Sequence, residues 1–263
     1  MSGTDKMLAK KEGRVGYVIF NNPERHNAVS LEMWETTAAI LEDFAKDEGI
    51  GVVVLTGVGG KAFVSGADIS KFEDERATQA AVARYNAAVE NIYAGLHEFP
   101  KPTIAMIRGY CIGGGLGLAV SCDIRIASDN ARFALPAAKL GLGYDLPGIK
   151  RFVDTLGPSF TKEIFFTARQ FDATEAREMG LVNRVLPDGE VEAYVKNYAD
   201  TIGSNAPLTV NSVKYIVGEV LKDESKRNTA RCTELVKKCF ASRDYIEGRK
   251  AFMEKRKPVF TGS

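Results

Sequence analysis

Short runs of β-branched and other apolar residues alternate with amphipathic stretches through the first half of the chain. The runs at residues 15–20, 50–56, 103–107 and 123–127 predict strands, and a further short strand is expected at Phe133. Between them, apolar residues recur at helical spacing, first at Leu31, Trp34, Ala38, Leu41 and Ala45, and later at Val82, Tyr85, Val89, Ile92 and Leu96. This alternation predicts an α/β domain in which helices cover a sheet.

From about Gly148 onward the pattern becomes almost wholly helical. A helix is expected to begin near Gly148, and Pro207 fits the first turn of a later one. One apolar stripe in this half is formed by Val191, Tyr194, Val195, Tyr198 and Ile202. We therefore expect residues 1–200 to form the core that contains the sheet, and residues 201–263 to form an appended helical segment.

The composition is that of an ordinary globular protein, with 45% hydrophobic and 26% charged residues. The net charge of +1 provides no overall field that would attract nucleic acid or an anionic membrane. No run of about 18 apolar residues is present, and the start of the chain has no apolar signal core. We expect a cytoplasmic protein that binds neither nucleic acid nor a membrane. The four cysteines are expected to be reduced, and together with only two histidines they disfavour a metal site.

Two glycine-rich segments follow predicted strands. The first, residues 60–69, contains Gly66 and Ala67 and could present free backbone amides, although most turns of this kind have no chemical role. In the second, Gly113, Gly114 and Gly115 lie between the strand at 103–107 and a helix expected at 116–121. Unsatisfied amides and a positive helix end at this point suit a developing oxyanion. Close packing of a helix on a strand is the alternative explanation for these glycines.

Taken together, these segments resemble the crotonase superfamily, the enoyl-CoA hydratase and isomerase family, over nearly the whole chain. The matching residues are Asn22-Pro23, Asn27-Ala28, Ala62-Phe63, Gly66-Ala67-Asp68, Pro102, Gly113-Gly114-Gly115, Glu247-Gly248, Ala251-Phe252, Lys255-Arg256 and Pro258 to Phe260. The resemblance implies an α/β fold with a crotonase-like ββα spiral core and a C-terminal helical trimerisation region. It also implies a trimer or a dimer of trimers.

The resemblance further implies that an acyl-coenzyme A thioester is the substrate, with its carbonyl oxygen held by the amides of Ala67 and Gly114. No permanently bound cofactor is expected, because coenzyme A arrives as part of the substrate. Positions that match coenzyme-binding residues of the family are Arg25, Ala28, Lys61, Ala62, Phe63, Asp68 and Ile69. Phe252 and Lys255, both expected on a final helix, match positions that reach coenzyme A across a subunit interface.

The chain departs from the hydratases of this family at both of their catalytic glutamates, where it has Gly117 and Ala137. Addition of water to an enoyl thioester needs a base and an acid, so ordinary hydration is disfavoured. The nearest titratable residues are Tyr144 and Asp145. Tyr144 resembles an active-site tyrosine of methylmalonyl-CoA decarboxylase, and Asp145 coincides with an active-site aspartate of dienoyl-CoA isomerase.

Decarboxylation of an alkylmalonyl-CoA type of substrate fits these residues best, because loss of carbon dioxide yields an enolate without a strong base. Tyr144 would orient the leaving carboxylate, and Asp145 or water would return a proton. Three alternatives remain. The chain could be an enoyl-CoA double-bond isomerase that uses Asp145, an atypical hydratase, or a non-catalytic scaffold that binds a CoA thioester or associates with RNA. Asp145 could also be only a helix cap, with Tyr144 packed beneath it.

Overall fold

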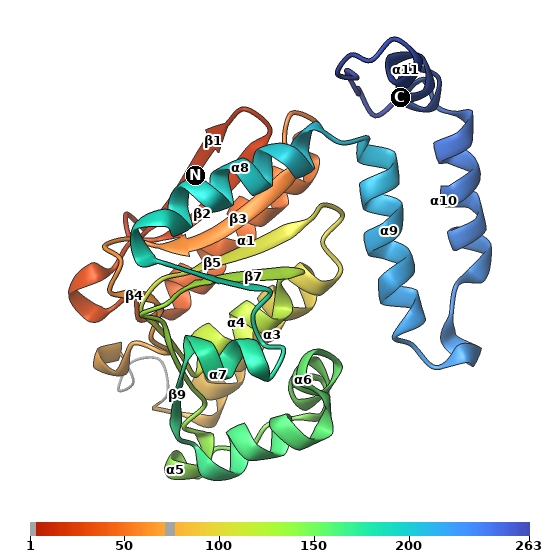
Figure 1. Cartoon of the computed structure of the whole chain (residues 1–263). Coiled ribbons are helices and arrows are strands. Elements are labelled where there is room, and N and C mark those ends of the chain that lie inside the picture. Colours follow the sequence, from red (N-terminus) through yellow and green to blue (C-terminus); the bar gives the residue numbers. More distant parts are fainter. Residues whose placement is uncertain (1–3, 72–76) are drawn as a thin grey trace.

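Two β-sheets form the centre of the part of the chain that the computed structural model describes, residues 4–71 and 77–263 (Figure 1). The six-stranded sheet has the order β1 (Met7–Glu12), β2 (Val15–Phe20), β3 (Val52–Gly57), β5 (Thr103–Ile107), β7 (Ile124–Ser128) and β10 (Arg184–Leu186). Strand β1 pairs antiparallel with β2, and the other neighbours are parallel.

The second sheet contains four short strands in the order β4 (Ala62–Val64), β6 (Tyr110–Ile112), β8 (Arg132–Ala134) and β9 (Gln170–Asp172). The first three are parallel, and β9 runs antiparallel to β8. Strands β4, β6 and β8 each follow a strand of the larger sheet in the chain. The polypeptide therefore alternates between the two sheets, and the turns after β4 and β6 come to lie side by side.

Both faces of the six-stranded sheet are buried. Val53 and Leu55 of β3 pack into a large core with helices α1 (Leu31–Lys46), α3 (Gln79–His97) and α4 (Gly114–Ser121). Val52 and Val54 face the opposite side, where helix α8 (Val191–Ser204) covers the sheet. The period-two alternation of a strand explains this division, because successive side chains point to opposite faces.

The remaining helices in the described part are α5 (Ala137–Leu140), α6 (Leu146–Thr167), α7 (Ala173–Glu178), α9 (Pro207–Val220), α10 (Thr229–Ala241) and α11 (Arg243–Met253). Short 3-10 turns occupy Pro23–Arg25, Ile69–Lys71, Asp188–Glu190 and Glu224–Lys226. Helix α6 is kinked at Gly157, which has a φ of 73° and precedes Pro158. Helices α9 and α10 lie side by side and project away from the sheets with α11 at their end (Figure 1).

The projecting helices carry many exposed apolar side chains. Val213, Val217 and Val220 of α9 are exposed, and so are Phe240 of α10 and Ile246 of α11. Exposed apolar patches of this kind mark surfaces for association. The division at residue 200 and the role of the final segment in trimerisation stay predictions.

The sequence patterns predicted the main strands and helices. Strands β2 and β5 coincide with the predicted ranges, and β3 and β7 are each displaced by one or two residues at their ends. The expectation of an almost wholly helical second half was wrong at β9 and β10, which are too short to show a period. None of the helices in residues 4–71 and 77–263 is long and apolar enough to cross a membrane.

Candidate active site

The loop after β4 presents the amide of Ala67. Val29 and Ala67 form a parallel bridge, in which the Val29 amide donates to the Gly66 carbonyl at 2.9 Å and the Asp68 amide donates to the Val29 carbonyl at 3.0 Å. Because successive peptide groups of an extended chain point to opposite sides, the N–H of Ala67 faces away from Val29. It donates to no other group in the described part of the chain. Gly66 allows this turn with a φ of 108°.

The loop after β6 presents the amide of Gly114. Gly113 has a φ of 55° and a ψ of −115°, and its own amide donates to the Ala134 carbonyl at 2.9 Å. Helix α4 begins at Gly114, two residues earlier than expected, so this amide is one of the unpaired donors of a first helical turn. Within residues 4–71 and 77–263 it has no hydrogen-bond acceptor.

The two loops pack against each other with almost no space between their backbones. A Cβ atom added to Gly114 would lie 4.0 Å from the Cα of Gly66, and one added to Gly66 would lie 3.4 Å from the Ile112 carbonyl oxygen. A Cβ atom at Gly115 would come within 2.0 Å of the Val64 carbonyl oxygen. Glycine is therefore required sterically at 115, whereas Cβ atoms at Gly66 and Gly114 would make ordinary contacts, and both unpaired amides lie in this region.

Asn27 holds the first loop from behind. Its side-chain Nδ2 donates to the carbonyl oxygens of Ala62 at 2.7 Å and Val58 at 3.0 Å, while its Oδ1 accepts from the Asn22 amide at 2.9 Å. Asn27 is fully buried and has a left-handed φ of 54°, which asparagine adopts more readily than most residues. The Asn27-Ala28 pair noted in the sequence thus fixes the start of β4.

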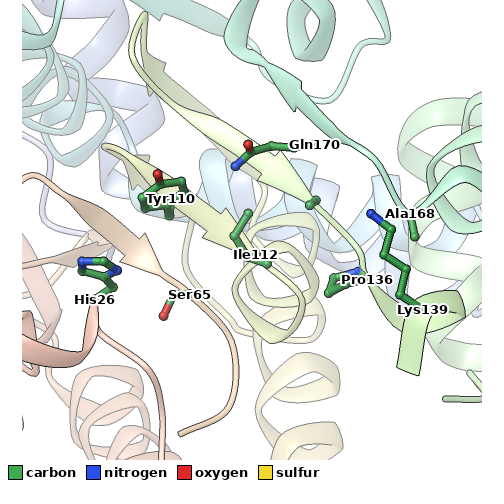
Figure 2. A pocket seen from close by; sticks show the side chains of 9 residues that line it. His26, Ser65, Tyr110, Ile112, Pro136, Lys139, Ala168 and Gln170 are labelled. Carbon is green, nitrogen blue, oxygen red and sulfur yellow. The ribbon is translucent and has the colours of Figure 1, made fainter. Parts of the chain in front are cut away.

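A cavity of about 430 Å³ opens directly beside the two loops (Figure 2). Ser65 and Ile112 in its wall immediately precede Gly66 and Gly113, and Pro136 precedes Ala137. The full lining is His26, Ser65, Tyr110, Ile112, Ala134, Pro136, Lys139, Ala168 and Gln170. A neighbouring cavity of about 320 Å³ shares His26 and includes Lys61 and Ala62. The two cavities therefore lie next to each other, and the larger one is lined by residues that precede the amide loops.

Neither glutamate position carries a carboxylate. Gly117 lies inside α4, and Ala137 is the first residue of α5 and is buried. A Cβ atom at Gly117 would lie 2.8 Å from the hydroxyl oxygen of Tyr93. The Tyr93 hydroxyl donates to the Gly114 carbonyl at 2.6 Å. Sequence reasoning missed Tyr93, although a second glycine within a short buried helix is a signal of a large neighbouring side chain.

Tyr144 and Asp145 lie at the start of α6. Asp145 is the N-cap of this helix, with its Oδ1 accepting from the Gly148 amide at 2.9 Å, and it is exposed. The Tyr144 ring meets the edge of Phe165 with ring centres 5.0 Å apart. Burial raises the pKa of Tyr144, and Tyr144 is close enough to Tyr93 to contribute to the raised pKa of that residue, after the larger effect of burial. The capping and packing considered from the sequence are therefore present.

The predicted coenzyme-binding residues divide into two groups. Arg25, Lys61 and Ile69 are exposed near the two cavities or their loops, whereas Ala28, Ala62 and Asp68 are buried there. The Phe63 side chain is fully buried in the core, so the predicted contact of Phe63 with the coenzyme would be made by its backbone.

Phe252 and Lys255 lie at the far end of the C-terminal helices and are exposed. Placing both on a final helix was wrong for Lys255: α11 ends at Met253, and Lys255 has a left-handed φ of 53°. The projection of α9 to α11 away from the sheets keeps both residues out of the cavities of their own chain (Figure 1).

The spiral of two sheets and the paired amide loops define a protein of the crotonase fold class. Residues 10–263 match the family model Enoyl-CoA hydratase/isomerase. The chain belongs to this family, and its members act on acyl-coenzyme A.

Curated relatives and solved structures agree with this assignment. A short-chain-enoyl-CoA hydratase from Clostridium acetobutylicum is 33% identical over 96% of both chains, and a crotonyl-CoA hydratase from Syntrophomonas wolfei is 32% identical over 97% of this chain and 98% of its own. The crystal structure of an enoyl-CoA hydratase/carnithine racemase from Magnetospirillum magneticum superposes with a TM-score of 0.93 at 34% identity, covering 99% of this chain and 97% of that one.

Proposed function

We propose that the chain binds an acyl-coenzyme A thioester, holds the enolate made from it between the amides of Ala67 and Gly114, and decarboxylates an alkylmalonyl-type substrate. The observation that carries this proposal is the combination of two unpaired amides on adjacent loops with the absence of a carboxylate at positions 117 and 137. The amides can stabilise negative charge on the thioester oxygen. Nothing at the two glutamate positions can activate water.

The chemistry of decarboxylation matches this arrangement. Cleavage of the bond between the α-carbon and the substrate carboxylate releases carbon dioxide, and the bonding electron pair becomes the enolate. A proton then adds to the α-carbon and restores a neutral thioester. In this proposal Tyr144 orients the leaving carboxylate, and Asp145 or a water molecule returns the proton. The Tyr144 phenol is protonated at neutral pH like that of any tyrosine, as a hydrogen-bond donor must be, and burial raises its pKa further.

The two neighbouring cavities are large enough in combination to suggest where the coenzyme binds. Lys61 and Ala62 line the smaller cavity, with Arg25 and Ala28 in the adjoining loop. We assign the phosphates and the nucleotide to this end, and the pantetheine arm to the larger cavity that ends at the amides. Asp68 and Ile69 extend the first loop and complete the coenzyme site, together with the Phe63 backbone. Phe252 and Lys255 would reach it from a neighbouring subunit of a trimer.

A second candidate is an enoyl-CoA isomerase or atypical hydratase that uses Asp145. The names of the relatives favour it, since those at 32–33% identity are called enoyl-CoA or crotonyl-CoA hydratases.

A panel of methylmalonyl-, ethylmalonyl-, crotonyl- and 3-enoyl-coenzyme A, followed by mass spectrometry, separates the candidates. We expect loss of carbon dioxide from one of the malonyl-type substrates. Turnover of crotonyl- or 3-enoyl-coenzyme A alone would replace decarboxylation by the second candidate. Binding of every thioester with turnover of none would identify a scaffold without catalysis.

Two substitutions test the side chains. Tyr144→Phe should slow decarboxylation without loss of binding of a saturated acyl-coenzyme A. Asp145→Asn should also slow it, and because asparagine caps helices as well as aspartate, the start of α6 should stay intact. Full activity in both variants would overturn the assignment of these residues.

A further inference from the structure

The Tyr93 side chain fills the space in front of Gly117. A Cβ atom built on Gly117 would lie 2.8 Å from the Tyr93 hydroxyl oxygen and 2.9 Å from two of its ring carbons. Gly117 is in the interior of α4 and is not among the residues with positive φ, so its backbone accepts any L-amino acid. Gly115 differs, because there the obstacle is the backbone of Val64. Glycine at 117 is therefore required only by the tyrosine.

The Tyr93 ring has no room to move aside. Its hydroxyl donates to the Gly114 carbonyl at 2.6 Å, and the Trp34 ring meets it edge-on with centres 5.9 Å apart. The Arg151 guanidinium lies over it, 5.7 Å from the ring centre, and is held there by a bidentate ion pair with Glu90. The side chain is thus fixed by a hydrogen bond, an aromatic contact and a cation at once.

We propose that Tyr93 determines the reaction specificity of this site, because its phenol occupies the position from which a carboxylate on residue 117 would act. This inference rests on the proposed use of the Ala67 and Gly114 amides. The neutral Tyr93 phenol donates its proton in a hydrogen bond to the Gly114 carbonyl and cannot accept a proton from water. This side of the site therefore supplies no base for hydration. An enolate in this site must then arise by loss of a group such as carbon dioxide, or of a proton to a base on another residue, and not by addition of water at the neighbouring carbon.

A thermodynamic cycle tests the packing claim without any substrate. Gly117→Ala should lower the melting temperature of the parent by several degrees, because the added methyl group overpacks a fixed ring. The same change should cost little in a Tyr93→Ala background, where the ring is absent. Tyr93→Phe is the matched control: it keeps the ring carbons that lie at 2.9 Å, so Gly117→Ala should remain costly in it. Equal losses in all three backgrounds would refute the proposal.

A gain of function tests the specificity claim. Gly117→Glu is introduced together with Ala137→Glu, which supplies the second carboxylate, with and without Tyr93→Ala. We expect hydration of crotonyl-coenzyme A to rise at least about 100-fold when Tyr93→Ala is added, the lower end of what a positioned acid or base contributes. Equal hydration with and without the tyrosine would overturn the claim.

Calorimetric titration of the parent with butyryl-coenzyme A separates the two proposals. Absence of binding would remove the proposed function, while the melting cycle would still report on the contact between Tyr93 and Gly117. Binding together with equal melting losses would leave the proposed function standing and remove the role of Tyr93.

Discussion

Replacement of Gly114 by proline would delete one candidate oxyanion donor and leave the helix in place. Gly114 is the first residue of α4, where proline is well tolerated because the amide has no partner within the helix. The added Cβ atom would lie 3.4 Å from the Tyr93 hydroxyl and 3.8 Å from the Trp34 ring, both ordinary contacts. The preceding residue, Gly113, has no Cβ atom to clash with the proline ring.

The expected effect is large and falls on catalysis. Loss of one oxyanion donor typically costs a factor of about 100 to 1,000 in kcat, or about 2.7–4 kcal/mol of transition-state stabilisation. Gly114→Ala is the matched control, since it adds the same Cβ atom and retains the N–H group. The ratio of kcat/KM between the alanine and proline variants therefore reports the loss of the N–H group together with the ring carbon that replaces its hydrogen. We expect the proline variant to be about 100-fold or more slower than the alanine variant.

Steady-state kinetics on whichever thioester the wild-type chain turns over gives this ratio, and thermal unfolding of both variants checks the fold. The two melting temperatures should agree within a few degrees. A proline variant that unfolds like the alanine variant and works within threefold of its rate would refute the assignment of Gly114. In that case the glycines of the two loops would be explained by packing alone and not by catalysis.

Three further outcomes are expected. Asn27→Ala removes three hydrogen bonds, two buried and one partly buried, and should destabilise the chain by about 3 kcal/mol in denaturant unfolding. His26→Ala, with the same left-handed backbone but an exposed side chain, should cost clearly less. Burial raises the pKa of Tyr93 well above that of an unfolded tyrosine, so the contribution of Tyr93 to stability is complete below about pH 10 and is lost as the pH rises further. The free energy of unfolding, measured from about pH 8 to 11, should therefore fall less steeply for Tyr93→Phe than for the parent. Parallel curves for the two proteins would contradict the role of Tyr93 in this pH dependence. The exposed valines of α9 predict that chains associate, and the family resemblance predicts three or six chains per particle in sedimentation. Val213→Asp with Val217→Asp should dissociate this particle, and a monomeric parent would disprove association through this face.

The sequence predicted the parts of the fold that carry a strong local pattern. Strands β2 and β5 are apolar runs of five or six residues, helices α1 and α3 show clear helical periodicity, and their positions agree with the structure. Strands β4, β6, β8, β9 and β10 have three residues each, so no period can develop within them, and of these β8 was expected, from Phe133. Strand β1 escaped notice because its residues 8–11 are all exposed at the sheet edge and show no alternation.

The candidate site also contains features that local sequence signals predict and one contact, between two helices, that they do not. The loops that carry Ala67 and Gly114 were visible because glycine at a strand end is a local signal, and the structure explains Gly66 and Gly113 by a positive φ and Gly115 by a close backbone contact. Asp145 as a helix cap was also foreseeable from its place before Leu146-Pro147. The contact between α3 and α4 was not, since no local pattern pairs a tyrosine on one helix with a glycine on another.

That contact changes the meaning of the missing glutamate. From the sequence alone, Gly117 indicates only that a carboxylate is absent and that its place is empty. In the structure the place is filled by a phenol that is hydrogen-bonded to the carbonyl of Gly114, the residue whose amide is the candidate donor. Loss of a carboxylate would leave a gap that water could enter, whereas a packed ring excludes water and fixes the loop. Gly117 and Tyr93 are therefore better understood as one packed pair, and a carboxylate introduced at 117 alone should damage the protein before it adds any chemistry.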